Sequence, residues 1–141
     1  MKLVISDAAL IHSVGKYELA LEISRQAVAL GITVLVLIEI NSAKEECKSG
    51  VFPEDAEELL LAIRSLSNIR VVGLMTMGPA LDDAEGLRVY FRLTKELFDR
   101  LGERYGFGDS PILSMGMSDS YRVAIEEGST LVRVGRKLFK K

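Results

Sequence analysis

The sequence contains little of what several protein classes require. Its 141 residues include one cysteine, Cys47, and one histidine, His12. A single cysteine excludes an internal disulfide framework, and a single histidine argues against a structural zinc site. The longest apolar run, over residues 32–38 and interrupted only by Thr33, is far too short to span a bilayer. We therefore expect no metal site and no membrane partner.

Neither sign of charge dominates the chain. Eighteen Lys and Arg residues against 20 Asp and Glu residues give a formal net charge of −2, and no basic block is present. A nucleic-acid groove or a polybasic membrane anchor would need such a block. The apolar stretch after Met1 is too short for the core of a signal peptide. These features predict a cytoplasmic protein that binds no nucleic acid.

Two kinds of segment alternate along the chain. Apolar runs rich in β-branched residues, which are typical of strands buried on both faces, are at Ala9–His12, Thr33–Ile40, Arg70–Met75, Ile112–Met115 and Thr130–Val134. Segments with helical periodicity lie between them, at Tyr17–Leu30, Pro53–Leu66, Ala84–Tyr105 and Ser118–Glu127. This alternation predicts βαβ units and a parallel sheet.

The helical segments have recognisable apolar faces. In the segment 53–66, the expected buried residues are Ala56, Leu59, Leu60, Ile63 and Leu66. In the segment 17–30, the expected face is formed by Tyr17, Ala20, Leu21, Ser24, Ala27 and Val28.

No linker divides the chain, so residues 1–141 are predicted to form a single α/β domain. About five parallel strands with covering helices suit either an open doubly wound sheet or part of a (β/α) TIM barrel. A complete barrel needs eight strands and roughly 250 residues. If the chain is of the barrel type, we therefore expect a partial barrel that lacks the N-terminal part.

Polar and small residues follow the predicted strands where a ligand could bind. Ser114 to Ser118 connect a strand to a helix, so backbone N–H groups there could attract an anion, although Ser118 could equally be a simple helix cap. Arg133 interrupts an apolar strand and needs an acceptor, and Gly135 would let a ligand approach the backbone. Asn41 and Met75 lie at two other strand ends, where Met75 is more typical of packing.

Six segments together resemble one known family. They are Leu10–Val14, Asn41–Glu46, Lys48–Gly50, Gly73–Met77, Leu113–Ser118 and Val132–Gly135. The family is that of the pyridoxal-phosphate homeostasis proteins, also called the YggS or proline synthetase co-transcribed family, which shares the alanine racemase N-terminal barrel. The resemblance runs in order along nearly the whole chain.

The resemblance implies a pyridoxal 5'-phosphate site. Ser114 and the backbone N–H groups of Gly135 and Arg136 would hold the phosphate, and Arg133 would face the pyridine nitrogen. An Arg at that nitrogen keeps it unprotonated, which suits a cofactor carrier better than a transaminase. The other cofactor-binding candidates, at the same predicted edge of the sheet, are Asn41, Met75 and Ser118.

The family's Schiff-base lysine lies upstream of the segments that match, and no lysine of this chain fits its motif. We therefore expect no catalytic residue and cofactor binding that is weak, non-covalent or lost. Two alternatives remain open at this point: a structural module that pairs through exposed edge strands, and a racemase-like enzyme dependent on the cofactor. In a partial barrel, the first and last strands each lack a neighbouring strand on one side. This predicts a homo-oligomer that forms through the edge strands or through the open face of the barrel. We expect the inner face of such a sheet, formed by Val34, Val36, Val72 or Leu74, to lack the opposite wall that a closed barrel supplies.

Overall fold

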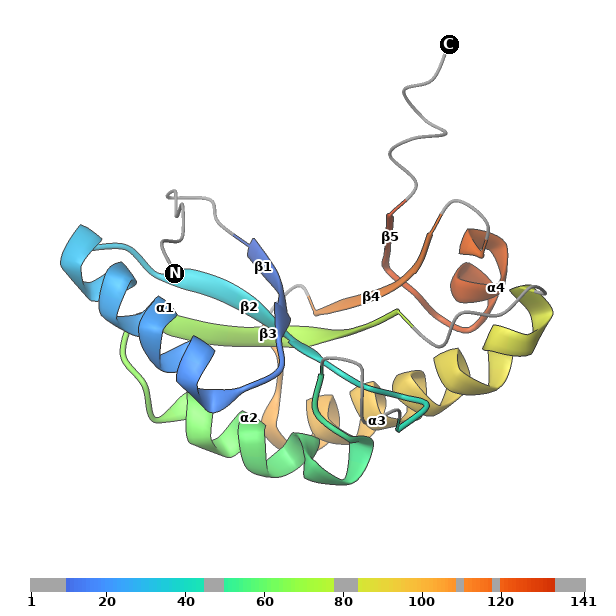
Figure 1. Ribbon diagram of the computed structural model, residues 1–141, viewed down its shortest axis with the longest axis horizontal. Coiled ribbons are helices and arrows are strands. Elements are labelled where there is room, and N and C mark those ends of the chain that lie inside the picture. The colour runs from blue at the N-terminus through green and yellow to red at the C-terminus, as the bar shows by residue number, and fades with distance from the viewer. Residues whose placement is uncertain (1–9, 45–49, 78–83, 109–110, 118–119, 134–141) are drawn as a thin grey trace, which may run out of the picture.

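The computed structural model describes residues 10–44, 50–77, 84–108, 111–117 and 120–133 (Figure 1). Five parallel strands form one sheet in the order of the sequence, β1-β2-β3-β4-β5. The strands are β1 (Leu10–Val14), β2 (Val34–Glu39), β3 (Ile69–Thr76), β4 (Ile112–Met117) and β5 (Leu131–Arg133). The predicted parallel α/β fold is confirmed, and the sheet is open, with β1 and β5 at its two edges.

Helices connect the successive strands. They are α1 (Tyr17–Leu30), α2 (Ala56–Arg64), α3 (Arg88–Tyr105) and α4 (Tyr121–Glu126), with single 3₁₀ turns at Pro53–Asp55 and Ala84–Leu87 before α2 and α3. In Figure 1, α1, α2 and α3 all lie below the sheet. A doubly wound sheet reverses its strand order and is covered on both faces, whereas a barrel keeps sequential order with helices outside. The arrangement is therefore that of a partial barrel.

The main core lies between the sheet and the helices. Four of the five residues predicted for the face of segment 53–66 are buried there, and Leu66 packs against them partly buried. Phe91 and Leu101 of α3 are fully enclosed in the same core. The prediction for α1 is partly wrong. Tyr17 and Val28 are exposed, and Ile23, which the predicted face omitted, is fully buried. Ser24 is buried as predicted, and its hydroxyl donates to the carbonyl of Ser67, 2.5 Å away. This bond ties α1 to the turn before β3.

A second, smaller cluster lies on the sheet face opposite the main core. Leu37, Val72 and Met75 form it, with Ile112 packed against them. Of the four residues expected on this inner face, only Val72 belongs to it. Val34, Val36 and Leu74 belong to the helix-side core. Alternation along the strands, interrupted by register shifts, decides which apolar residue faces which side.

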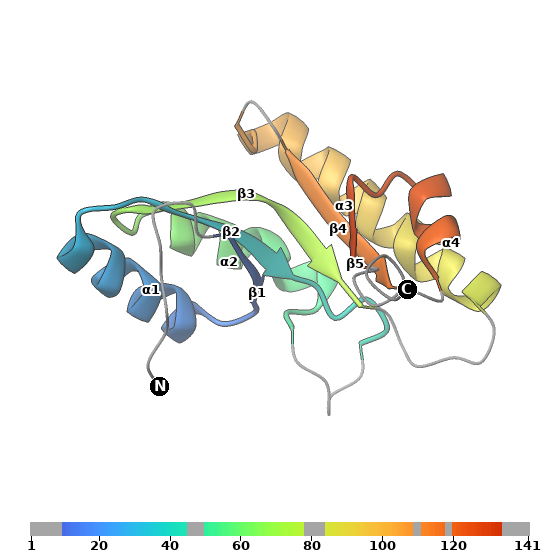
Figure 2. The same ribbon diagram turned by 90° about the horizontal axis from the view of Figure 1, so that it is seen from above.

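The third and fourth strands meet at a glycine. Gly73 is the first residue of β3 to pair with β4, opposite Ile112. A Cβ atom on Gly73 would lie 1.7 Å from the Ile112 carbonyl oxygen. Figure 2 shows β3 bending along its length, so that its second half runs beside β4. A glycine at such a position is typical of a bend in a curved sheet.

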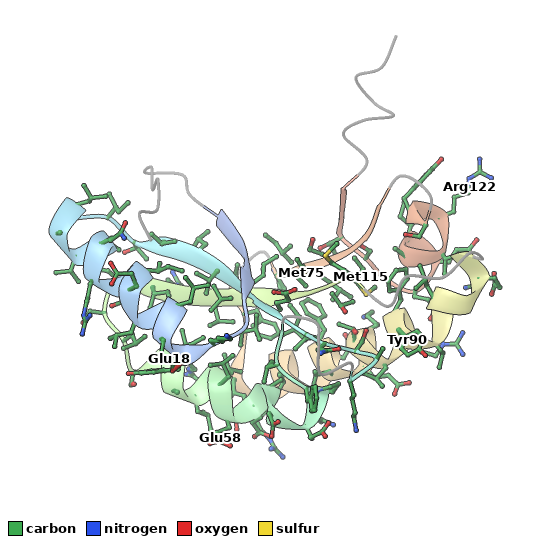
Figure 3. All side chains as sticks on the ribbon, viewed as in Figure 1. Glu18, Glu58, Met75, Tyr90, Met115 and Arg122 are labelled. Carbon is green, nitrogen blue, oxygen red and sulfur yellow. The ribbon has the colours of Figure 1, made fainter. Side chains whose placement is uncertain are left out.

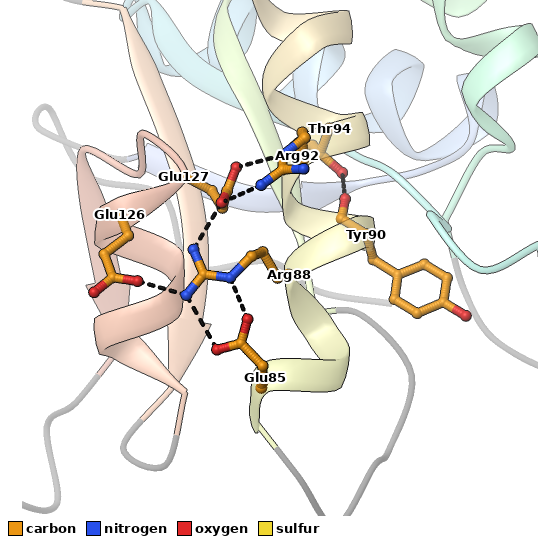
Figure 4. Close-up of polar contacts among 7 residues, drawn as sticks. All are labelled: Glu85, Arg88, Tyr90, Arg92, Thr94, Glu126 and Glu127. Carbon is orange, nitrogen blue, oxygen red and sulfur yellow. Dashed lines mark hydrogen bonds and ion pairs between the residues drawn. The ribbon is translucent and has the colours of Figure 1, made fainter.

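An ion cluster fastens α4 to the N-terminal end of α3 (Figure 4). Arg88 donates to Glu85, to Glu126 at 2.6 Å and to Glu127 at 2.8 Å. Arg92 donates to both carboxylate oxygens of Glu127 at 3.0 Å. The side chain of Glu127 is only 11% exposed. Hydrogen bonds from Arg92 and Arg88 lower the pKa of Glu127 to about 2.

This cluster predicts a specific loss of stability in acid. The pKa of Glu127 in the folded chain lies below its ordinary value of 4.5, so its carboxylate stabilises the fold above pH 4.5. That stabilisation is lost as the pH falls from 4.5 to about 2. We expect Glu127→Gln to lower the unfolding free energy at pH 7 and to flatten its decline over this interval. Urea unfolding at a series of pH values measures both effects. Glu103→Gln, at an exposed position of the same helix as Arg88, is the control, and an equal flattening there would contradict the assignment.

Candidate functional site

The candidate site lies at the carboxyl edge of the sheet. Because all five strands are parallel, their carboxyl ends lie at this edge, which is where ligands bind in barrels and open α/β sheets. Glu39 pairs with Met75, and Met75 pairs with Ser114, so these three residues form one row across β2, β3 and β4. Met75 belongs to the inner-face cluster. The row therefore runs across the inner face and carries a carboxylate, a thioether and a hydroxyl.

Met75 and Ser114 are both enclosed in this row. Met75 is 2% exposed and Ser114 is 1% exposed. Figure 3 shows Met75 at the level of the sheet, whereas Glu18 and Glu58 lie on the outer sides of their helices. Met75 thus supplies an apolar surface between the polar ends of the row.

The Ser114 hydroxyl is the most unusual polar group of the site. It is buried, and no hydrogen-bond partner for its Oγ exists among the residues that the structure describes. Leaving a buried hydroxyl without a partner costs roughly 1–3 kcal/mol. Such a cost is typical of a group that a ligand satisfies.

A pair of hydroxyls holds the ends of β2 and β3 together. Thr76 donates to the Ile40 carbonyl at 2.7 Å, and the Ser42 Oγ lies 3.0 Å from the Thr76 Oγ1. Both side chains are buried. The Ile40 N–H also donates to the Met75 carbonyl at 2.7 Å. These bonds fix the backbone on either side of the Asn41 segment, and sequence reasoning did not single out Ser42 or Thr76.

The segment that follows β2 returns to the edge of the sheet. Asn41 N–H donates to the Val51 carbonyl at 2.8 Å, and Val51 N–H donates to the Glu39 carbonyl at 2.9 Å. Gly50 precedes this contact with a φ of +104°. A Cβ atom on Gly15 would lie 2.8 Å from the Gly50 Cα. The turn after β1 therefore lies backbone to backbone against the end of this segment.

The structure brings together part of the predicted site. Met75 and Ser114 are neighbours in the row, and Asn41, which is 6% exposed, follows the end of β2 beside it. The backbone of Arg133 pairs with Met117 at the edge strand β5. The other three candidates, Ser118, Gly135 and Arg136, lie outside the described residues. Glu39, which sequence reasoning did not single out, is 8% exposed and completes the row.

The described ranges contain no group of three His, Cys, Asp or Glu side chains arranged to hold a metal ion. None of the helices described is long and apolar enough to cross a membrane.

Comparison with known proteins identifies the family. Residues 2–141 match the model of the alanine racemase N-terminal domain. The chain belongs to this family. Within it, the relatives place the chain with the pyridoxal phosphate homeostasis proteins. The protein of that name from Aquifex aeolicus is 45% identical over 139 residues, which cover 99% of this chain and 60% of the relative.

Solved structures of the family have the same fold. A protein of unknown function from Bifidobacterium adolescentis is 42% identical, with a TM-score of 0.81, over 89% of this chain and 50% of that one. PipY of Synechococcus elongatus, solved with pyridoxal phosphate bound, is 28% identical, with a TM-score of 0.75, over 89% of this chain and 57% of PipY. The family member described here thus spans little more than half the length of the relatives that it matches.

Proposed function

We propose that this chain provides a phosphate-binding edge for pyridoxal 5'-phosphate and serves in handling the cofactor rather than in turnover. The buried Ser114 hydroxyl carries the proposal, because a phosphate oxygen would give this group the hydrogen bond that the described residues do not supply. The relatives named for pyridoxal phosphate homeostasis and the PipY complex support the choice of ligand.

Each candidate residue has a defined task in this proposal. Ser114 donates its hydroxyl proton to a phosphate oxygen, and the N–H groups of Gly135 and Arg136 donate to the same phosphate. Arg133 donates to the pyridine nitrogen and thereby keeps that nitrogen unprotonated. Met75 provides an apolar floor.

Asn41 and Ser118 complete the polar lining of this proposed site. The cofactor, when bound, supplies an electron-accepting ring, and an unprotonated nitrogen weakens that property. The arrangement therefore favours binding without turnover.

We also propose that the binding is non-covalent, because none of the lysines in this chain fits the family's lysine motif. A lysine can form a covalent bond to the cofactor only if its amine is held against the reactive carbon. When the chain is mixed with pyridoxal 5'-phosphate and treated with sodium borohydride, we therefore expect no stoichiometric covalent adduct at one defined lysine.

Ser114→Ala tests the proposed site. We expect the wild-type chain to bind pyridoxal 5'-phosphate and the variant to bind it at least about tenfold more weakly, since a hydrogen bond to a charged group contributes roughly 1.5–3 kcal/mol. Without ligand, the variant should be as stable as the wild type or more stable by about 1 kcal/mol, because it removes a hydroxyl that lacks a partner. Isothermal titration and urea unfolding measure the two effects.

Ser65→Ala is the matched control for this experiment. Ser65 is exposed at the end of α2, and its hydroxyl bonds to the Ala62 carbonyl of its own helix. This variant should leave the affinity unchanged. Equal affinity of the Ser114→Ala and wild-type chains would contradict the site, and absence of binding in the wild type would contradict the function.

A second candidate, a module that assembles with another copy of itself, is favoured by the sheet edges at β1 and β5, each of which has a neighbouring strand on one side only among the described residues. The two proposals are compatible, and the assembly is tested separately by sedimentation as described in the Discussion.

A further inference from the structure

Two hydroxyl residues occupy the edge of β4 just before β5 begins. Thr130 N–H donates to the Leu113 carbonyl at 2.9 Å, and the Thr130 Oγ1 accepts the Leu113 N–H at 2.8 Å. The Ser129 Oγ accepts the Met115 N–H at 3.3 Å and lies 3.1 Å from the carbonyl oxygens of both Leu113 and Met115. Ser129 and Thr130 therefore reach all four backbone polar groups of the two residues that flank Ser114.

These contacts take the place of the regular backbone hydrogen bonds that a longer, evenly paired β5 would make with β4. The strand β5 pairs with β4 only at Ser114 and Met117, and the register shifts between the two positions. Gly116 interrupts regular strand geometry there, with a φ of +94°. The backbone around Ser114 is consequently held by β3 on one side and by Ser129 and Thr130 on the other.

The orientation of the Ser114 side chain depends on that backbone. Its Oγ has no hydrogen-bond partner among the described residues, so no hydrogen bond within them fixes the hydroxyl. Small movements of the peptide units at Leu113 and Met115 would move the hydroxyl with them. A displacement of about 1 Å is enough to weaken a hydrogen bond to a ligand severely.

We propose that Ser129 and Thr130 are positioning residues, which hold Ser114 in the orientation that binds a phosphate group without contacting the phosphate themselves. This inference rests on the proposed function and deepens it. Ser129 is itself fixed, because its N–H donates to the Ala124 carbonyl at the end of α4 at 2.9 Å. Ser129 thus connects α4 to the backbone of β4 on both sides of Ser114.

A double-mutant cycle separates positioning from a merely structural role. The probe is pyridoxal 5'-phosphate, titrated into Ser129→Ala and Thr130→Val in two backgrounds, with Ser114 present and with Ser114→Ala. In the Ser114 background, we expect each variant to lose about five- to tenfold in affinity. In the Ser114→Ala background, we expect a loss of less than twofold, because no hydroxyl is left to position.

Conservative variants test whether a hydroxyl at each position is enough to restore cofactor affinity. Ser129→Thr and Thr130→Ser keep the hydroxyls and should bind within about twofold of the wild type. Thr130→Val is nearly isosteric with threonine, so it tests the inference even if Ser129→Ala does not fold. Urea unfolding of every variant shows which of them are folded under the titration conditions.

The outcomes distinguish this inference from the proposed function. Absence of binding in the wild type overturns both. Binding that weakens in Ser114→Ala, together with equal losses from Ser129→Ala and Thr130→Val in both backgrounds, overturns only the positioning role. Losses confined to the Ser114 background support it.

Discussion

Gly73→Ala is expected to abolish the folded state or to lower the unfolding free energy by about 4 kcal/mol or more, out of a total that is typically 5–15 kcal/mol. The added Cβ would lie 1.7 Å from the carbonyl oxygen and 2.7 Å from the carbonyl carbon of Ile112. Both atoms belong to the backbone of β4, so the clash cannot be relieved by turning a side chain. The strands β3 and β4 would have to separate at their first pair.

Gly31→Ala is the control for this prediction. Gly31 ends α1 with a φ of +70°, and no heavy atom lies within 4 Å of the position that its Cβ would occupy. That variant bears only the cost of a left-handed backbone, about 1–2 kcal/mol. Urea unfolding followed by circular dichroism compares the unfolding free energies of the two variants. An equal loss in both would show that the backbone of β4 moves away from Gly73 at little cost, and would contradict the prediction.

Self-association is the second large effect that we expect. In the described part of the chain, β1 and β5 each have a neighbouring strand on one side only. Unpaired strand edges beside apolar side chains favour pairing with another copy. Leu35 is 37% exposed and, lying between the helix-side residues Val34 and Val36, belongs to the inner face of the sheet. We therefore expect sedimentation at micromolar concentrations to give at least twice the mass of a single chain.

A pair of leucine variants tests which surface is used. Leu35→Lys places a charge on the inner face, and Leu61→Lys places one on α2, where Leu61 is 47% exposed. If copies associate through the open face, Leu35→Lys should shift the population toward the monomer, and Leu61→Lys should not. A wild-type chain that sediments as a folded monomer would contradict the assembly.

Periodicity predicted the elements well because it reflects burial directly. The five strand segments and most of the buried face of α2 follow from apolar spacing alone. The face of α1 was predicted less well, since the helix offers apolar residues on several sides, and only packing shows that Ile23 is enclosed while Val28 is 54% exposed. Similarly, a run such as 34–38 does not reveal which of its residues face the helices.

The sequence predicts a site residue where its type is unusual for its position in a strand. It does not predict residues that join the site only through the register between paired strands. Ser114 stood out as a small polar residue at the end of an apolar strand. Glu39 enters the row only through its pairing with Met75. Thr76 and Ser129 act through backbone carbonyls, which every residue possesses, so nothing in their sequence context marks them.

The contact between Gly15 and Gly50 limits how these two positions can change over evolution. A clash between two side chains can be relieved by a second, smaller substitution at the partner position. Here the atom that a new side chain at Gly15 would strike is the Gly50 Cα, 2.8 Å away, and glycine has no side chain to give up. No compensating replacement at the partner position exists, so we expect selection from a library randomised at both positions to return glycine at Gly15 whatever residue is offered at Gly50.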